Sequence, residues 1–120
     1  MISKKEKKIL RGDLYYANLN PVCGSEQGGT RPVVIIQNDS GNLYSPTIIV
    51  AATTGRLDKP SLPTHTLLKE NGNNSLKKDT IILLEQIRTI DRYRLGNYIG
   101  RLNDYEMETM DMALAISVGL

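Results

Sequence analysis

A glycine-rich segment brings one arginine to the start of an apolar run. Residues 24–32 read Gly-Ser-Glu-Gln-Gly-Gly-Thr-Arg-Pro, and the chain then continues directly into Val33-Val34-Ile35-Ile36. Glycines let a backbone approach a ligand closely, and Pro32 pushes the preceding Arg31 toward an extended conformation. An arginine held in this way is a permanently charged, planar fork that binds phosphate or carboxylate. This segment therefore predicts an anion site centred on Arg31.

A pair of threonines ends another predicted strand. Residues 47–54, Thr-Ile-Ile-Val-Ala-Ala-Thr-Thr, change from bulky and apolar to small and polar, which indicates a strand that leaves the core for a site. Only one of Thr53 and Thr54 can face that site, because side chains alternate along a strand. A hydroxyl in this position is able to donate a hydrogen bond to an anion held by Arg31.

Metal-dependent chemistry does not suit this chain. It has one histidine (His65) and one cysteine (Cys23), and its carboxylates show no paired spacing, whereas a zinc site needs three or four ligands. We therefore expect no metal and no cofactor. RNA is cleavable without a metal because its own 2′-hydroxyl attacks the adjacent phosphorus. The protein must then deprotonate that hydroxyl, stabilise the phosphoryl oxygens and help the 5′-oxygen leave.

Three segments carry a resemblance to a known family. They are residues 11–15 (Arg-Gly-Asp-Leu-Tyr), residues 24–32 and residues 83–91 (Leu-Leu-Glu-Gln-Ile-Arg-Thr-Ile-Asp). In this order they resemble the MazF/PemK toxins of bacterial type II toxin–antitoxin systems. The resemblance implies a sequence-selective, metal-independent endoribonuclease that cleaves single-stranded RNA (mRNA), works as a homodimer and is silenced by a MazE-like antitoxin.

The resemblance also implies roles for individual residues. Arg31 and Thr54 match the catalytic arginine and threonine of the family, so Thr54 rather than Thr53 is expected to face the site. Arg31 suits charge stabilisation, because an arginine does not readily give up a proton. The general base stays open between His65 and Glu26, and Glu85 and Gln86 are compatible either with bracing the sheet or with reading a base edge. Further RNA contacts are expected from Ser25, Glu26, Gln27, Asn38, Arg56, His65, Glu85, Gln86 and Thr89.

Charge is distributed unevenly along the 120 residues. Residues 1–11 hold five basic side chains and one acidic one, whereas the rest holds 10 basic and 12 acidic side chains. We therefore expect a solvated basic extension over residues 1–10 and a single domain over residues 11–120. Because the domain is nearly neutral, an RNA groove must obtain its positive field locally. No apolar stretch reaches the ~20 residues of a membrane span, and a lone cysteine suits the cytoplasm.

The order of the predicted elements defines the fold class. Strands are predicted at residues 13–19, 32–37, 47–54, 64–68 and 79–90, with turns at 38–42 and 91–95. Asn103 and Glu106 form a capping-box pattern, and Met107, Met110, Leu114 and Val118 then recur at helical spacing. Five or six strands closed by a C-terminal helix predict an α+β, mainly β fold. The toxin family implies the same architecture, a small, SH3-like, partly open β-barrel.

Two other functions are compatible with these residues. The first is a non-catalytic or gyrase-directed toxin on the same fold, which an RNA cleavage assay distinguishes from a nuclease. The second is an interaction domain whose glycine-rich loop binds a carboxylate of a partner, in which case RNA does not bind.

Overall fold

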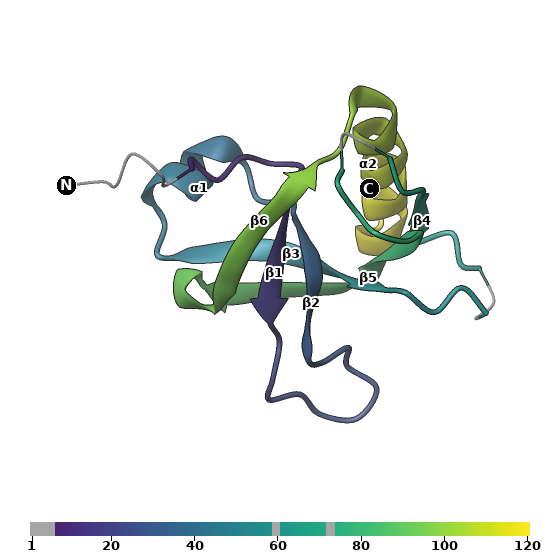
Figure 1. The fold of residues 1–120 in the computed structure, drawn as a ribbon, viewed down its shortest axis with the longest axis horizontal. Coiled ribbons are helices and arrows are strands. Elements are labelled where there is room, and N and C mark those ends of the chain that lie inside the picture. Colours follow the sequence, from purple (N-terminus) through teal and green to yellow (C-terminus); the bar gives the residue numbers. More distant parts are fainter. Residues whose placement is uncertain (1–6, 59–60, 72–73) are drawn as a thin grey trace.

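A computed structural model describes residues 7–58, 61–71 and 74–120. One antiparallel sheet has the strand order β4-β5-β3-β2-β1-β6 and does not close (Figure 1). The strands are β1 (Asp13–Asn18), β2 (Thr30–Ile35), β3 (Thr47–Thr54), β4 (His65–Leu68), β5 (Thr80–Asp91) and β6 (Leu95–Arg101). The helices are α1 (Asp39–Tyr44), the 3-10 turn η1 (Arg92–Arg94) and α2 (Asp104–Val118). The prediction of a mainly β, partly open barrel with a C-terminal helix is confirmed.

The sheet is bent and buries apolar side chains on both faces. Val34 and Ala51 belong to a cluster that α2 covers, whereas their neighbours Val33 and Val50 belong to a second cluster on the other face. Strand alternation sends successive side chains to opposite faces, so a continuous apolar run is what such a strand requires. Tyr15 is accordingly buried while the adjacent Tyr16 remains exposed.

Two elements differ from the sequence-based expectation. Residues 38–42 were predicted as a turn, but Asn38 caps α1 by accepting a hydrogen bond from the Gly41 amide. The same short polar residues favour turns and helix N-caps, so composition did not separate the two. Strand β6 was not predicted, because its sequence, Leu-Gly-Asn-Tyr-Ile-Gly-Arg, contains residues that are depleted in strands. Pairing with β1 supplies the stability that local propensity lacks.

The N-terminal extension is anchored where the structure describes it. Asp13 is fully buried and forms ion pairs with Lys7 at 2.7 Å and with Arg101 at 3.0 Å. The Leu10 amide donates to the same carboxylate at 2.9 Å, and Ile9 packs against the core. The buried carboxylate therefore holds residues 7–10 against the domain, while the side chains of Lys7 and Lys8 stay exposed to solvent. Residues 1–6 lie outside the described part of the chain.

Helix α2 lies against β4 and β5 (Figure 1). Its predicted capping box is present: the Asn103 side chain accepts from the Glu106 amide at 2.8 Å, and Glu106 accepts from the Asn103 amide at 2.9 Å. Met110 is fully buried, but Val118 is 54% exposed, so the prediction that it belongs to the buried stripe is wrong. Val118 points away from the sheet, since the preceding Ser117 donates to the Leu84 carbonyl of β5 at 2.5 Å.

Met110→Ala tests whether α2 is part of the core. Removing this fully buried side chain leaves a cavity, and we expect the free energy of unfolding to fall by about 2–5 kcal/mol. Glu108→Ala, on the exposed side of the same helix, is expected to change it by less than about 0.5 kcal/mol. Urea unfolding at one fixed protein concentration measures both. If the two substitutions lowered the free energy of unfolding equally, Met110 would not be the residue that α2 buries in the core.

Candidate functional site

The site begins with an irregularity in the longest strand. Ala51 of β3 pairs with Ile87 of β5, but the next residue, Ala52, pairs with Leu83. Residues 84–86 therefore have no ladder partner on β3. Such a bulge re-aims the side chains of the bulged strand. Here it contains Leu84, Glu85 and Gln86, which makes the last two available for contacts outside the ladder.

Gln86 binds the loop that joins β1 to β2. Its side-chain oxygen accepts from the Gln27 amide at 3.1 Å, and its side-chain nitrogen donates to the Ser25 carbonyl at 3.3 Å. The Gln27 side chain in turn donates to the carbonyl of Thr53 at 3.1 Å. The loop, which protrudes from the sheet in Figure 1, is thus tied to both β5 and β3.

Arg31 lies at the base of this loop, near the start of β2. Its Nε donates to the Gly28 carbonyl at 2.6 Å, and its Nη1 donates to the Thr53 carbonyl at 3.0 Å. Gly29, which precedes the strand, has a φ of +79°, a conformation that favours glycine. Among the described residues no group accepts a hydrogen bond from Nη2 of Arg31. Two backbone carbonyls therefore orient the guanidinium and leave one of its edges for a ligand.

The two threonines at the end of β3 have different environments. Thr53 is buried, and its hydroxyl donates to the Pro32 carbonyl at 2.5 Å. Thr54 is also buried, but its hydroxyl oxygen accepts from the Arg56 amide at 3.1 Å. The Thr54 proton has no acceptor in the described ranges. Thr53 thus uses its hydroxyl within the fold, whereas Thr54 keeps a proton to donate.

A pocket of about 420 Å³ opens beside Arg31. Arg31, Lys77 and Lys78 all line it, and no carboxylate of the described residues does. Thr53 and Tyr16 also border it, whereas Thr54 does not. Although the whole domain is nearly neutral, three cationic side chains give this pocket a positive field. The sequence-based expectation that a groove would supply its own field matches this arrangement.

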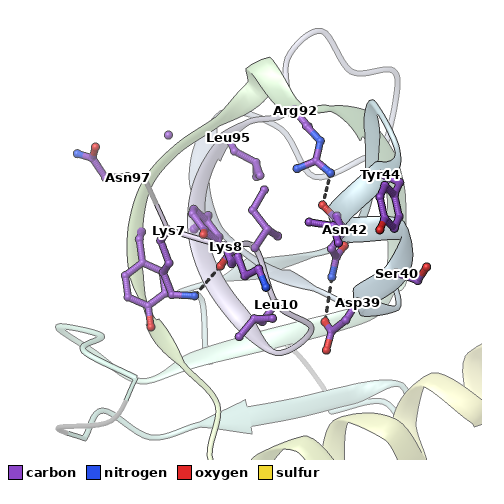
Figure 2. A pocket seen from close by; sticks show the side chains of 15 residues that line it. Lys7, Lys8, Leu10, Asp39, Ser40, Asn42, Tyr44, Arg92, Leu95 and Asn97 are labelled. Atoms are coloured by element: carbon purple, nitrogen blue, oxygen red, sulfur yellow. Dashed lines mark hydrogen bonds between the residues drawn. The ribbon is translucent and has the colours of Figure 1, made fainter. Parts of the chain in front are cut away.

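A second, larger cavity of about 820 Å³ lies on the other side of β1, where Tyr15 rather than Tyr16 lines it. Figure 2 shows that Arg92 donates to the backbone carbonyl of Asn42 and Lys7 to that of Lys8, while the Asn42 side-chain amide reaches Asp39 at 3.3 Å. The buried Tyr15 hydroxyl has no partner among the described residues. Burial, followed by the charge of Asp13, raises its pKa to about 12.

Comparison with known proteins decides the family. Residues 10–118 match the family described as PemK-like, MazF-like toxin of type II toxin–antitoxin system. The chain belongs to this toxin family. It is also 57% identical over 110 residues to a protein named endoribonuclease MazF from Staphylococcus saprophyticus, covering 92% of this chain and 91% of the relative. The predicted family and the predicted endoribonuclease function are therefore confirmed.

Solved structures of the MazF family share the fold. MazF from Deinococcus radiodurans superposes with a TM-score of 0.80 at 20% identity, covering 96% of this chain and all (100%) of that chain. A mycobacterial endoribonuclease, solved in complex with its cognate antitoxin, gives a TM-score of 0.76 at 23% identity, covering 93% and 96%. No helix in the described ranges is long and apolar enough to cross a membrane.

A second polar group in this MazF-like chain lies at the same bulge. Glu85 accepts from the Thr64 hydroxyl at 2.8 Å and contacts Nε2 of His65 at 3.0 Å. The other ring nitrogen of His65 accepts from the Leu62 amide at 3.3 Å. Burial alone would raise the pKa of Glu85, but the hydrogen bonds from Thr64 and His65 outweigh it and hold that pKa below its ordinary value. His65 thus has partners at both ring nitrogens.

The remaining predicted residues are distributed more widely. Glu26 accepts from the Cys23 amide at 2.8 Å within the loop, and the exposed Arg56 pairs with Asp58 at 3.3 Å. Asn38 follows the end of β2 opposite to Arg31, and Thr89 pairs with Ile49, five positions before Thr54 on β3. The structure therefore gathers Ser25, Gln27, Arg31 and Gln86 around Thr53, but it does not bring Asn38 or Thr89 to them.

Sequence reasoning did not identify Lys77 and Lys78 as part of the site. They lie in the polar connection before β5, where a pair of lysines is typical of a solvated surface. Only the fold brings this connection beside Arg31. No local pattern carried that information.

The Glu85 contacts predict a specific dependence of stability on pH. A carboxylate whose pKa is lowered by folding adds stability above its ordinary value of 4.5 and loses that contribution as pH falls through the folded-state value. We expect the thermal midpoint of the wild type to fall more steeply than that of Glu85→Gln below pH 4.5. Glu108→Gln, which removes an exposed carboxylate, should follow the wild type. Parallel curves for the wild type and Glu85→Gln would contradict this interpretation.

Proposed function

We propose that this protein is the toxin of a type II toxin–antitoxin system that cleaves single-stranded RNA, in a sequence-selective way, through attack by the 2′-hydroxyl and without a metal ion. The observation that supports it most is the guanidinium of Arg31, which two carbonyls orient toward a pocket whose charged lining groups, within the described ranges, are all cations. A phosphodiester is the anion that such a fork fits. The Staphylococcus relative is named for endoribonuclease activity.

Arg31 and Thr54 are the proposed catalytic residues. Arg31 stabilises the charge that develops on the phosphoryl oxygens, using the guanidinium edge that the carbonyls leave unpaired. Thr54 keeps a proton for the same group, but its side chain is buried and does not line this pocket, so the contact requires a local rearrangement that exposes the hydroxyl. No general base is assigned, because His65 is engaged at both nitrogens and Glu26 at one carboxylate oxygen. The loop and the bulge support RNA binding through Ser25, Glu26, Gln27, Glu85 and Gln86.

The wider RNA contacts stay a proposal. Arg56 follows Thr54 closely and is exposed, so it suits a contact with the strand next to the site. His65 lies at the bulge beside Glu85. Asn38 and Thr89 lie further from Arg31 along their strands, and a long single strand would have to pass over the sheet to meet them.

Two macromolecular partners are proposed. The first is a MazE-like antitoxin, since the mycobacterial neighbour was solved with its cognate antitoxin and a Deinococcus neighbour with a TM-score of 0.72 is a MazE–MazF structure. An extended acidic segment of such a partner would compete with RNA for the cationic pocket. The second is another copy of this chain, because Met112, Ile116 and Leu120 leave the outer side of α2 apolar and exposed. A cytoplasmic location suits the single exposed thiol of Cys23.

Cleavage of a defined RNA tests this function. Arg31→Ala is expected to lower the single-turnover rate by about 10²–10³ because one preorganised donor is lost, and Arg31→Lys to restore little because an ammonium lacks the bidentate fork. Thr54→Ala should lower turnover more than affinity. Thr53→Ala should be milder in turnover, since its hydroxyl is already bonded to Pro32. Excess EDTA should leave the rate unchanged.

Mapping the ends of the cut strands gives the chemistry. A 2′,3′-cyclic phosphate and a 5′-hydroxyl are the products that attack by the 2′-hydroxyl requires. His65→Ala serves as the control and should retain most of the activity. The assignment fails if His65→Ala abolishes cleavage while Arg31→Ala retains it. A wild type that binds RNA without cutting it would instead favour a non-catalytic or gyrase-directed toxin.

A further inference from the structure

A lysine outside the family motifs lies over the backbone beside the proposed catalytic threonine. A Cβ built on Gly55 would lie 2.6 Å from both Cε and Nζ of Lys78. Gly55 directly follows Thr54, so the Lys78 ammonium lies over the α-carbon of the residue next to Thr54. The three atoms nearest to that position all belong to the Lys78 side chain. The missing side chain of Gly55 therefore makes room for this ammonium.

The charge of Lys78 is not used within the described fold. The ion pairs there involve Lys7, Arg11, Arg56, His65 and Arg101 with their carboxylates. Lys78 forms none of them, and the part of the chain that the structure describes contributes no carboxylate to the pocket that Lys78 lines together with Arg31. Three cations (Arg31, Lys77 and Lys78) that share one pocket without a counter-charge repel one another, so an anion bound among them is favoured. Lys78 thus resembles a ligand-binding residue more than a structural one.

The other walls of the pocket indicate what kind of anion fits. Tyr16 is 40% exposed and borders the pocket together with Ile99 and Pro32. An aromatic and apolar wall beside these cations fits a nucleotide unit, because unpaired bases stack on aromatic rings while cations hold the phosphate. Inorganic phosphate would use only the cationic part of the pocket.

We propose that Lys78 is a second phosphate-binding residue of the RNA site, which holds the backbone of the bound strand together with Arg31, and that Gly55 keeps its ammonium in place. This inference rests on the proposed function, since it concerns the same RNA. A phosphate contact positions the strand without reading its sequence, so the contribution of Lys78 is the same for all RNA sequences. The specificity of cleavage must come from other residues.

Lys78→Met and Gly55→Ala test the two parts of the inference. Lys78→Met is expected to weaken binding of an uncleavable 2′-deoxy oligonucleotide by about threefold to tenfold and to reduce the salt dependence of binding by ~0.7 in log–log slope. Lys78→Arg should keep that slope. Lys69→Met, which removes an exposed lysine that does not line the pocket, is the matched control and should have no effect.

Gly55→Ala displaces the ammonium without removing it. Gly55 does not have a positive φ, and the atoms that the new methyl meets are the end of a flexible side chain, so the protein is expected to fold. Its effect on binding should have the same sign as that of Lys78→Met. In the double variant the two effects should not add, because both act on one group. If the two losses of binding free energy added in the double variant, Gly55 would not act by positioning the Lys78 ammonium.

The outcomes separate this inference from the proposed function. If Arg31→Ala loses cleavage while Lys78→Met keeps the affinity and salt slope of the wild type, the inference is wrong and the function stands. If the wild type cuts no RNA, the proposed function fails, and the oligonucleotide affinity of Lys78→Met against Lys69→Met still decides the role of Lys78. A loss in Lys69→Met equal to that in Lys78→Met would overturn the inference, because it would reflect net charge alone.

Discussion

The carbonyl oxygen of Thr53 accepts hydrogen bonds from two side chains of the glycine-rich region. Gln27 reaches it from the loop at 3.1 Å, and Arg31 reaches it from β2 at 3.0 Å. This oxygen belongs to a buried residue of a central strand, so its position is set by the core. These two hydrogen bonds therefore attach the glycine-containing loop to a buried strand in the middle of the sheet. The orientation of Arg31, and with it the pocket, depends on this shared acceptor.

The bulge in β5 completes the arrangement from the other side. A regular ladder would pair Glu85 and Gln86 with β3 and would leave the loop without its contacts to Gln86. Because residues 84–86 leave the ladder, one side chain binds the loop and its neighbour binds Thr64 and His65. Glu85 and Gln86 thus brace the structure in the absence of RNA, which is one of the two roles that their sequence position allowed.

The sequence alone predicted the position of an element correctly where one strong signal lay within a few neighbouring residues. The change from apolar to polar residues gave the bounds of β3, and the Asn103–Glu106 pattern gave the start of α2, since both signals lie within a few residues. It was insufficient for β6, whose glycines and asparagine form a strand only through pairing with β1. The long-range contacts of Gln86 and the position of Lys78 over Gly55 likewise follow from the fold alone. The resemblance to the family proposed Arg31 and Thr54 as catalytic residues, but the carbonyls that orient Arg31 carry no sequence signal.

The central claim is that the β5 bulge, through its contacts with the glycine-rich loop, holds the guanidinium of Arg31 in the orientation proposed for catalysis. Single-turnover cleavage of RNA by Gln86→Ala tests it most directly, because this change leaves Arg31, Thr54 and Thr53 intact while removing both bonds to the loop. A misplaced guanidinium slows the chemical step, so we expect the rate constant at saturating protein to fall by about tenfold to a hundredfold, beyond the loss of RNA affinity that follows from removing a proposed RNA contact. A Gln86→Ala variant that cleaves at the wild-type rate would contradict the account.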